Sequence, residues 1–454
     1  MQRFLWRSGL ALSAFLLALS GMLWLALENA RPRPPTTLVD LDAPGPGHAE
    51  RQKDVWFIFL SGPPEVRGAD MQRFVGKSMM AIDATMHATF REVVPSLPLR
   101  ILIEIAGRLF GRNLDRDIPE EIQREIVGQM HAYEDAFGDG GGKYARFLSY
   151  LALHDLAQTI EHSPLIACSG FAVTGSQSAS GGTIVGRNFD FEAGRIFDEE
   201  KSVTVVTPEK GFKHASVAWP GMNGVVTGIN EKRVWVSVNA ARSDHELSRG
   251  VPVSLGIRQV LEAAATADEA VRILEKMETR VADLYLVADP HTAYVVEKTP
   301  VRAFTRGMLQ DRIIVTNHFT EPALRAEARN LKLERATTSI DRGLRMEQLV
   351  HGQSKARTPL DAQAILRDRK TPFGGEYVTG DRHAIDGYIA THGAFADLGK
   401  DILYVSRAPH LSNTWIGISL SALFEGRAEI VDELPAEPEA LIAGEALGYR
   451  APGK

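Results

Sequence analysis

The N-terminus of the chain carries a long run of uncharged, mostly apolar residues. Residues 9–27 read GLALSAFLLALSGMLWLAL, and Arg3 and Arg7 are the only charged residues before them. A helix of this length is near the lower limit for crossing about 30 Å of hydrocarbon. The run could be a cleaved signal peptide, but it lacks an A-x-A-like exit, so we favour a retained transmembrane anchor over residues 1–30.

The charges around this run predict where the rest of the chain lies. Basic residues precede the run, which by the positive-inside rule places the body on the exported, periplasmic or extracellular side of a membrane. Arg31 and Arg33 follow the run and weaken this orientation. The expected localisation is therefore a membrane-anchored protein with an exported body.

Residues 31–68 are predicted to form a linker and the start of the folded body. The linker begins as RPRPPTTLVDLDAPGPG, in which five prolines stiffen the chain and apolar residues are too few to build a core. Such a segment behaves as a semi-rigid, solvated spacer between the membrane and the body.

Apolar residues recur at helical spacing between residues 69 and 167. In EEIQREIVGQMHAYEDAF they fall at Ile122, Ile126, Met130 and Tyr133, and KYARFLSYLALHDLAQTI continues the period. Glycines between the two segments mark a break, and no GK[ST] ending follows them to suggest a phosphate loop. The sequence therefore predicts a largely helical unit here.

After Pro164 the pattern changes to short segments rich in Val, Ile, Tyr and Thr, bounded by Gly, Pro, Asn or Asp. These predicted strands are GTIVGRNF, SVTVVTP, RVWVSVN, DLYLVAD, TAYVVEK, RIIVTN and DILYVSR. Two helices interrupt them, PVSLGIRQVLEAA and EAVRILEKME, and Thr266 with Glu269 has capping-box spacing before the second. Strands in groups with helices between the groups indicate α+β layers rather than alternating βαβ units.

Composition narrows the class of protein. The chain has 454 residues, of which 24% are charged and 44% hydrophobic, which is typical of a globular protein and excludes collagen, coiled coils and wholesale disorder. The formal charge of −6 comes without a block of like charge, so no nucleic-acid partner is expected. The single cysteine excludes an internal disulfide and a multi-thiolate metal site, but it can be a nucleophile.

That cysteine, Cys168, stands where the helical region gives way to the strands. It lies in SPLIACSGFAV, where the small neighbours Ala167, Ser169 and Gly170 leave the backbone accessible. A free cysteine is often just a small buried apolar residue. The segment GRNFDF that follows contains a cation and a carboxylate, which could both lie near one strand end.

Four segments in order carry a family resemblance. They are Cys168 itself, GRNFDF at 186–191, GINEKRVWVSVN at 228–239 and VTNHF at 315–319. In this order they resemble the N-terminal-nucleophile (Ntn) hydrolases of the acyl-coenzyme A:6-aminopenicillanic acid acyltransferase kind, and more distantly the choloylglycine hydrolases and acid ceramidases. The similarity covers roughly residues 115–430.

The resemblance implies a fold and a division of the chain. The fold is an α+β four-layer αββα sandwich, with two antiparallel sheets between helices and Cys168 on an internal strand. Residues 69–167 would form a helical, pro-segment-like α-part, and residues 168–454 the catalytic β-part. The two parts would stay associated after the chain cuts itself at Ala167–Cys168.

The resemblance also implies a chemistry that suits a lone cysteine. A free thiol has a pKa near 8.5 and needs activation, whereas an α-amine has a pKa of about 7.7 to 8.0. Cleavage of the Ala167–Cys168 bond would give Cys168 such an amine, which can take the proton of its own thiol. The thiol would make the cut itself by an N-to-S acyl shift, and no histidine is needed.

Further site residues are implied position by position. Asp190 would orient the new amine, and Arg187 would favour the thiolate. Asn239 and Asn317 would donate to the oxyanion, although Asn at a strand end is also a common turn cap. A second arginine is expected after VTNHF; Arg342 is our candidate. Arg335 is the alternative, and either arginine could instead be a solvated helix charge.

The function expected is a self-processing cysteine amidohydrolase or acyltransferase that attacks a linear amide through a Cys168 thioester. Its substrate would be a small acyl amide or acyl thioester, with no cofactor and no metal. The alternatives are a phospholipase-B-like ester hydrolase on the same scaffold and a non-catalytic, membrane-tethered binding protein. The acyl chain, the acceptor, the oligomeric state and the choice between hydrolysis and transfer stay open.

Two histidines offer other interpretations. His318 and His392 could serve a metal, but HExxH is missing, and a papain-like His318–Cys168 pair lacks the local papain signature. Trp219, Trp235 and Trp415 are expected to fill the core rather than an acyl pocket.

Overall fold

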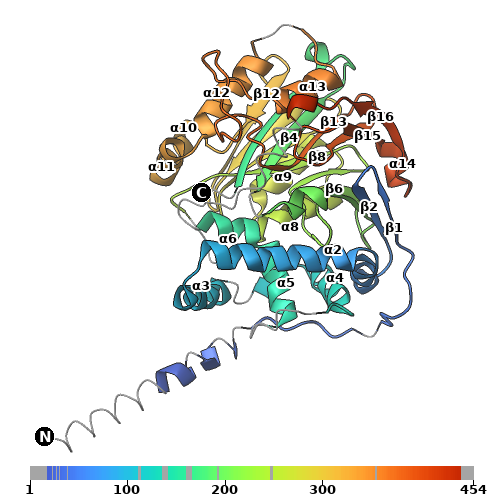
Figure 1. The fold of residues 1–454 in the computed structure, drawn as a ribbon, viewed down its shortest axis with the longest axis vertical. Helices are drawn as coiled ribbons and strands as arrows, with labels where there is room; N and C mark the ends of the chain where they lie inside the picture. The colour runs from blue at the N-terminus through green and yellow to red at the C-terminus, as the bar shows by residue number, and fades with distance from the viewer. Residues whose placement is uncertain are drawn as a thin grey trace, which may run out of the picture.

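The structure is a computed structural model in which two β-sheets pack face to face with helices on both outer faces (Figure 1). It describes residues 18–440 apart from 23, 27, 30, 38, 111–113, 135–141, 160–165, 192–193, 246–248 and 353–354. Most of the predicted anchor, residues 1–30, lies outside the described residues. Among the helices that are described, none is both long and apolar enough to cross a membrane.

The first sheet has nine strands in the order β1-β2-β5-β6-β7-β8-β9-β10-β11, antiparallel except where β2 meets β5. Its strands are β1 (His48–Gln52), β2 (Val55–Leu60), β5 (Ser202–Val206), β6 (His214–Ala218), β7 (Thr227–Asn230), β8 (Trp235–Ala240), β9 (Asp283–Ala288), β10 (Ala293–Lys298) and β11 (Ala303–Gly307). The sequence does not predict β1 and β2, because it indicates only a linker and the start of the body over residues 31–68.

The second sheet has seven antiparallel strands in the order β12-β3-β4-β13-β14-β15-β16. Its strands are β12 (Arg312–Val315), β3 (Ile166–Val173), β4 (Ile184–Phe191), β13 (Ala390–Asp397), β14 (Ile402–Ser406), β15 (Trp415–Ser419) and β16 (Ile430–Leu434). β3, which carries Cys168, is an internal strand, because it pairs with β12 on one side and with β4 on the other.

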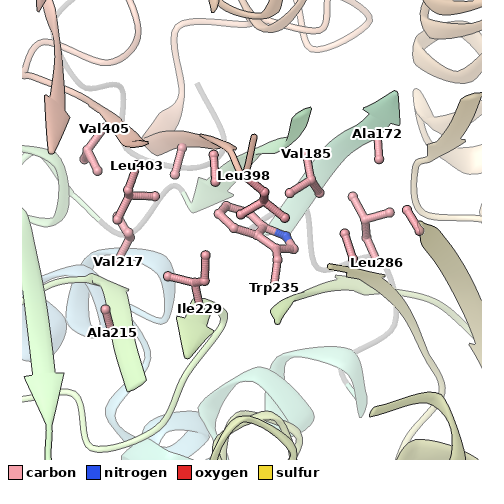
Figure 2. Packing of buried hydrophobic residues seen from close by; sticks show 14 of the residues in the cluster. Ala172, Val185, Ala215, Val217, Ile229, Trp235, Leu286, Leu398, Leu403 and Val405 are labelled. Atoms are coloured by element: carbon pink, nitrogen blue, oxygen red, sulfur yellow. The ribbon is translucent and has the colours of Figure 1, made fainter. Parts of the chain in front are cut away.

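The largest apolar cluster fills the space between the two sheets (Figure 2). Figure 2 shows Val217, Trp235 and Leu286 of the first sheet facing Val185 and Val405 of the second. Side chains alternate along a strand, so β8 turns Trp235 inward while its neighbour faces the outer helices. Because both faces of these strands are buried, their sequences read as nearly continuous apolar runs.

Helices cover each outer face of the sandwich. On the first sheet lie α8 (Val253–Ala263) and α9 (Ala267–Lys276), and on the second lie α12 (Ser339–Val350) and α13 (Pro359–Leu366). The other described α-helices of the β-part are α7 (Ile196–Glu199), α10 (Pro322–Arg325), α11 (Ala328–Ala336) and α14 (Leu420–Phe424). The expected order of layers, helices, sheet, sheet and helices, is therefore present as a mixed α/β sandwich.

The α-part is helical, as predicted, and packs around the β2–β5 side of the first sheet. It contains α2 (Pro64–Val93), α3 (Leu97–Phe110), α4 (Glu120–Met130), α5 (Lys143–Leu151) and α6 (Leu153–Thr159). α2 and α4 cross closely at Gly68 and Gly128. A Cβ added to Gly128 would lie 1.8 Å from Glu65 O, so only glycine allows this crossing.

A buried ion cluster joins the α-part to the β-part. Glu125 of α4 accepts from Arg258 of α8 at 2.6 and 2.7 Å and from Arg67 of α2 at 2.8 Å. Burial alone would raise the pKa of Glu125, but Arg258 and Arg67 outweigh it and lower this pKa to about 2. If the chain is cut at Ala167–Cys168, this cluster would remain as a polar connection between the fragments.

We expect Glu125→Gln to lower the free energy of unfolding by about 3 kcal/mol or more, because it leaves buried arginines short of a counter-charge. Glu120→Gln, on the exposed start of the same helix, should change it by less than about 0.5 kcal/mol. Because the pKa of Glu125 is lower in the folded protein than in the unfolded chain, its carboxylate stabilises the fold fully above pH 4.5. This stabilisation is lost as the pH falls towards 2. Urea unfolding at several pH values should therefore show the two variants converging only below pH 4.5, and equal losses at pH 7 would contradict the role of Glu125.

Candidate active site

Cys168 lies inside the protein, with none of its surface exposed. On β3 its cross-strand partner is Phe189 of β4, and Ala167 before it pairs with Asp190. The two residues of the predicted cleavage bond are thus held in one sheet register, and the chain before Cys168 continues the strand rather than leaving it.

Arg187 of β4 contacts the sulfur directly. Its Nη2 donates to Cys168 Sγ at 2.8 Å and also to Val238 O, and its Nη1 donates to Thr227 Oγ1 at 2.8 Å. The guanidinium carbon lies 4.7 Å from the centroid of the Phe189 ring. Because both terminal nitrogens are bound and the side chain is buried, the positive charge is held in place beside the sulfur.

His392 lies behind Arg187, in a role that the sequence did not predict. Its Nε2 is 2.9 Å from Thr227 Oγ1, and its ring stacks on Phe189 with centroids 5.3 Å apart. Burial, followed by the charge of Arg187, holds the pKa of His392 well below its usual value, so the ring is neutral at pH 7. Since Thr227 Oγ1 accepts a hydrogen bond from Arg187, its hydroxyl can donate one to His392 Nε2. These two hydrogen bonds orient the arginine.

The environment of the sulfur favours the neutral thiol in the intact chain. Burial is the largest influence and raises the pKa of Cys168; the charge of Arg187 is next and lowers it. Asp190 raises this pKa, whereas Arg342 and the N–H of Ala240 lower it, and the net direction is upward. Formation of a thiolate here therefore requires a base.

Asn317, just after β12, binds the backbone nitrogen of Cys168. Its Oδ1 accepts from Cys168 N at 2.9 Å and from Arg342 Nη2 at 2.9 Å. Its Nδ2 donates to Ala240 O at 2.9 Å. The side chain thus contacts the nitrogen that cleavage would release, while the amide group expected to meet an oxyanion is bound to a carbonyl.

Arg342 of α12, the candidate arginine, contacts Cys168 directly. Its Nη1 donates to Cys168 O and, at 2.9 Å, to Ser169 Oγ, and the side chain is buried. Arg335 is exposed on α11. One turn before Arg342, Ser339 Oγ accepts from Asn317 N at 2.8 Å. The first turn of α12 therefore positions both Asn317 and Arg342, which contact Cys168.

Asp190 follows Arg187 on β4 and lies opposite Ala167. Burial raises its pKa to about 6, against the opposing charges of Arg342 and then Arg382. Within the described chain its Oδ1 is buried without a hydrogen-bond partner. A carboxyl group with a pKa of about 6 therefore lies beside the predicted cleavage bond. That Asp190 orients the new α-amine stays a prediction.

Asn239 of β8 lies near these residues but is bound elsewhere. Its Nδ2 donates to Thr316 O at 2.9 Å, and its side chain is buried. This contact ties β8 to the segment that leads into Asn317. Its predicted role as an oxyanion donor is likewise untested.

His318, one of the two histidines considered from the sequence, contacts Ser339. His318 Nδ1 lies 2.8 Å from Ser339 Oγ, and burial lowers its pKa to about 4. No hydrogen bond to Cys168 is found for His318 in the described part of the chain. Over the same described residues, no group of three or more His, Cys, Asp or Glu side chains could hold a metal ion.

A pocket lies between the α-part and the β-part, close to this site. The walls that come from the β-part include Phe189, Phe191, Trp219 and Val226, which share one apolar cluster with Cys168. The walls that come from the α-part are Met79, Ile82, Asp83 and Met86 of α2, Tyr133, Phe147, Tyr150 and Leu151 near and on α5, and Leu153 and His154 of α6. Neither part forms the pocket without the other.

Trp219 corrects one expectation. The sequence predicts that it fills the core, but it lines the pocket, stacked on Phe191 with centroids 5.6 Å apart and edge-on to Phe197 at 4.9 Å. Trp235 and Trp415 are fully buried in core clusters, as predicted. The sequence alone does not show which tryptophan borders the pocket, because the opposite wall comes from the α-part.

Residues 178–383 match a family model described as acyl-coenzyme A:6-aminopenicillanic acid acyl-transferase. This confirms the resemblance expected from the sequence motifs. Arg187, Asp190, Asn317 and Arg342 fall inside the match, whereas Cys168 lies before it. A comparison with curated proteins gave no significant match.

Solved structures with a similar chain trace include three hydrolases. A Caenorhabditis elegans N-acylethanolamine-hydrolyzing acid amidase ortholog is 17% identical, covering 58% of this chain and 100% of its own, with a TM-score of 0.39. A mutant of conjugated bile acid hydrolase from Clostridium perfringens is 13% identical, covering 58% and 96%, with a TM-score of 0.38. Penicillin V acylase from Agrobacterium tumefaciens is 16% identical, covering 60% and 92%, with a TM-score of 0.39.

The placement of the two arginines predicts unequal effects on stability. Arg342→Ala removes charged hydrogen bonds to Cys168 O and Ser169 Oγ and should lower the free energy of unfolding by about 2 to 4 kcal/mol. Arg335→Ala, its exposed counterpart, should change it by less than about 0.5 kcal/mol. Urea unfolding followed by tryptophan fluorescence measures both, and a harmless Arg342→Ala would show that the helix end does not fix this site.

Proposed function

We propose that the protein is a self-processing cysteine amidase or acyltransferase, which cuts Ala167–Cys168 and then attacks linear amides through a Cys168 thioester. One observation carries the proposal. The nitrogen, the carbonyl oxygen and the sulfur of Cys168 are each bound by a separate buried polar side chain, Asn317, Arg342 and Arg187. A cysteine that only fills a core needs none of these contacts. The family match over residues 178–383 supports the same interpretation.

The first reaction would be an N-to-S acyl shift at the cleavage bond. Cys168 Sγ attacks the Ala167 carbonyl carbon, a C–S bond forms, the C–N bond breaks, and the thiol proton ends on the released nitrogen. Water then hydrolyses the thioester and leaves a carboxylate on Ala167. Asn317, which holds Cys168 N, would keep the nitrogen of the scissile peptide group still while its bond breaks, and Arg342, which holds Cys168 O, would fix the peptide group that follows.

In the mature enzyme the new α-amine would serve as the base for its own thiol. Its ordinary pKa of about 7.7 to 8.0 suits proton transfer near neutral pH. Asn317 Oδ1 already lies 2.9 Å from this nitrogen and would orient it, while Asp190 would supply a carboxylate next to the vacated position of Ala167. Nucleophile and base on one residue need little reorganisation.

Arg187 would hold the developing thiolate, and its contacts with Thr227, backed by His392, would keep its geometry fixed. The amides of Asn239 and Asn317 now donate to Thr316 O and Ala240 O. To stabilise an oxyanion, each would have to exchange that carbonyl for the substrate oxygen. Loss of such a donor typically slows a reaction about 100-fold to 1,000-fold.

The pocket supports an amide with an apolar acyl group as the substrate. Most of its β-part walls are aromatic or apolar, with Asn223 and Ser254 as the polar residues, and they reach Phe189, the cross-strand partner of Cys168. An acyl chain there would place its carbonyl towards the sulfur. Because α2, α5 and α6 form the other wall, the two fragments would have to stay together for the enzyme to bind this substrate.

The N-terminal run, residues 9–27, would hold this enzyme at a membrane with its body exported. After cleavage the tether and the nucleophile would belong to different fragments. The Glu125–Arg258 contacts and the α-part wall of the pocket would then keep the β-part attached. The same thioester could pass its acyl group to water or to an amine.

The proposal is tested by reaction with electrophilic acyl analogues of increasing chain length. We expect Cys168 of the wild-type protein to be labelled and Cys168→Ser to stay unlabelled, with labelling about tenfold or more faster for a long apolar chain than for acetyl, as burial of a few methylenes predicts. Trp219→Ala should reduce this preference for long chains, whereas Trp219→Phe should keep most of it.

Absence of labelling in a correctly folded protein would favour a non-catalytic binding protein. Faster turnover of acyl esters than of matched amides would favour the phospholipase-B-like alternative. A chain-length preference that Trp219→Ala leaves unchanged would remove the pocket from the account while leaving the nucleophile in place.

A further inference from the structure

Helix α3 displays apolar side chains to solvent. It spans Leu97–Phe110 with the sequence LPLRILIEIAGRLF. Five of its large aliphatic side chains are between 39% and 61% exposed: Leu97, Leu99, Ile101, Leu102 and Leu109. Val93, at the end of α2, continues this surface.

The helix is exposed on most sides, including the side of Glu104, and three of its leucines form one apolar stripe. At about 100° per residue, Leu99, Leu102 and Leu109 fall within an arc of about 80° on the side opposite Arg100. Arg100 is half-buried, whereas these leucines are exposed. A surface helix normally turns its apolar side to the core, so an outward apolar side marks a surface that something else covers.

Other exposed apolar residues gather at the same end of the molecule. In Figure 1, α3, α5 and the first described residues of the chain all lie at the lower end of the long axis. The described part of the N-terminal run exposes Leu19, Met22, Trp24 and Leu25. Arg31, which follows that run, lies against Gly142 at the start of α5.

We propose that α3 lies flat in the surface of a lipid bilayer, with its leucine side in the acyl-chain boundary. At about 1.5 Å per residue the helix is too short to span a bilayer, but its length suits the interface. The stripe of Leu99, Leu102 and Leu109 is aliphatic, which suits hydrocarbon better than the Tyr-, Trp- and Arg-rich surfaces that protein partners favour. The chain that leaves this end of the molecule is itself a long apolar run, residues 9–27.

The charges on α3 and just before it fit the same partner. Arg91 is exposed on the last turn of α2, just before α3, and Arg100 lies with Glu104 away from the apolar stripe. Arginines beside an aliphatic face can reach lipid phosphates while the leucines enter the hydrocarbon. The inference does not depend on the proposed activity, although α2 leads directly from the pocket residues Met79 and Met86 to this surface.

The lone cysteine makes a direct test simple. In a Cys168→Ala background, Leu102→Cys and Leu344→Cys each carry one environment-sensitive fluorophore, the second on a similarly exposed leucine of α12. The full chain is reconstituted in vesicles of phosphatidylcholine with phosphatidylglycerol. We expect emission from position 102 to shift to the blue and to lose most of its intensity to a quencher attached to lipid tails, while position 344 does neither.

A label at position 102 that stays in water in these vesicles would overturn the proposal. A blue shift of this label in detergent, without vesicles, would also overturn it. A shift that grows with protein concentration would mean that a second copy covers α3. A shift that does not depend on concentration would mean that another segment of the same chain covers it. Because no turnover is measured, these outcomes are independent of whether Cys168 is a nucleophile.

Discussion

The structure depends on how three elements from distant parts of the chain meet at one residue. Asn317 follows β12, Arg342 lies on α12 and Arg187 on β4, and each binds a different atom group of Cys168. Buried charges are costly unless they are paired and hydrogen-bonded. The sulfur, the Cys168 carbonyl and the nearby charge of Asp190 therefore offset the burial of these two arginines. The shared contacts hold β3, β4 and α12 in one arrangement.

The same constraint explains the layers around the site. β3 is internal, so Cys168 has β4 on one side and β12 on the other, and both strands deliver a polar residue to it. The inter-sheet core fixes β8 against β3, which brings Val238 O and Ala240 within reach. In the intact chain the sulfur is fully buried, and Ala167 continues the strand beside Asp190. Cleavage would give that end of the strand freedom to move and could open the way to the pocket.

Much of this could be predicted from the sequence, for identifiable reasons. The helical region and the strands after Pro164 follow from periodicity, and the order of the motifs is enough to group Cys168, Arg187, Asp190 and Asn317 in one site. The sequence makes Arg342 the candidate but keeps Arg335 as an alternative, because both lie in a charged helical stretch and only packing buries one of them.

Other features have no local signal at all. Thr227 and His392 come from β7 and β13, and they meet at Arg187 only because the two sheets face each other. The pocket wall at Trp219 and the outward leucines of α3 are likewise invisible in the sequence, because each depends on what lies opposite rather than on the residues themselves. β2 is different, because VWFIFL is a β-rich apolar run that is easily overlooked beside the prolines of residues 31–47.

The most direct test of the central claim is the intact mass of the purified protein. We predict that the wild-type chain yields a fragment that begins at Cys168 and ends at Lys454, with a separate fragment ending at Ala167, while Cys168→Ala stays in one piece. A wild-type chain that remains uncut and yet turns over an acyl amide would contradict the account, because the nitrogen held by Asn317 would then never become the base.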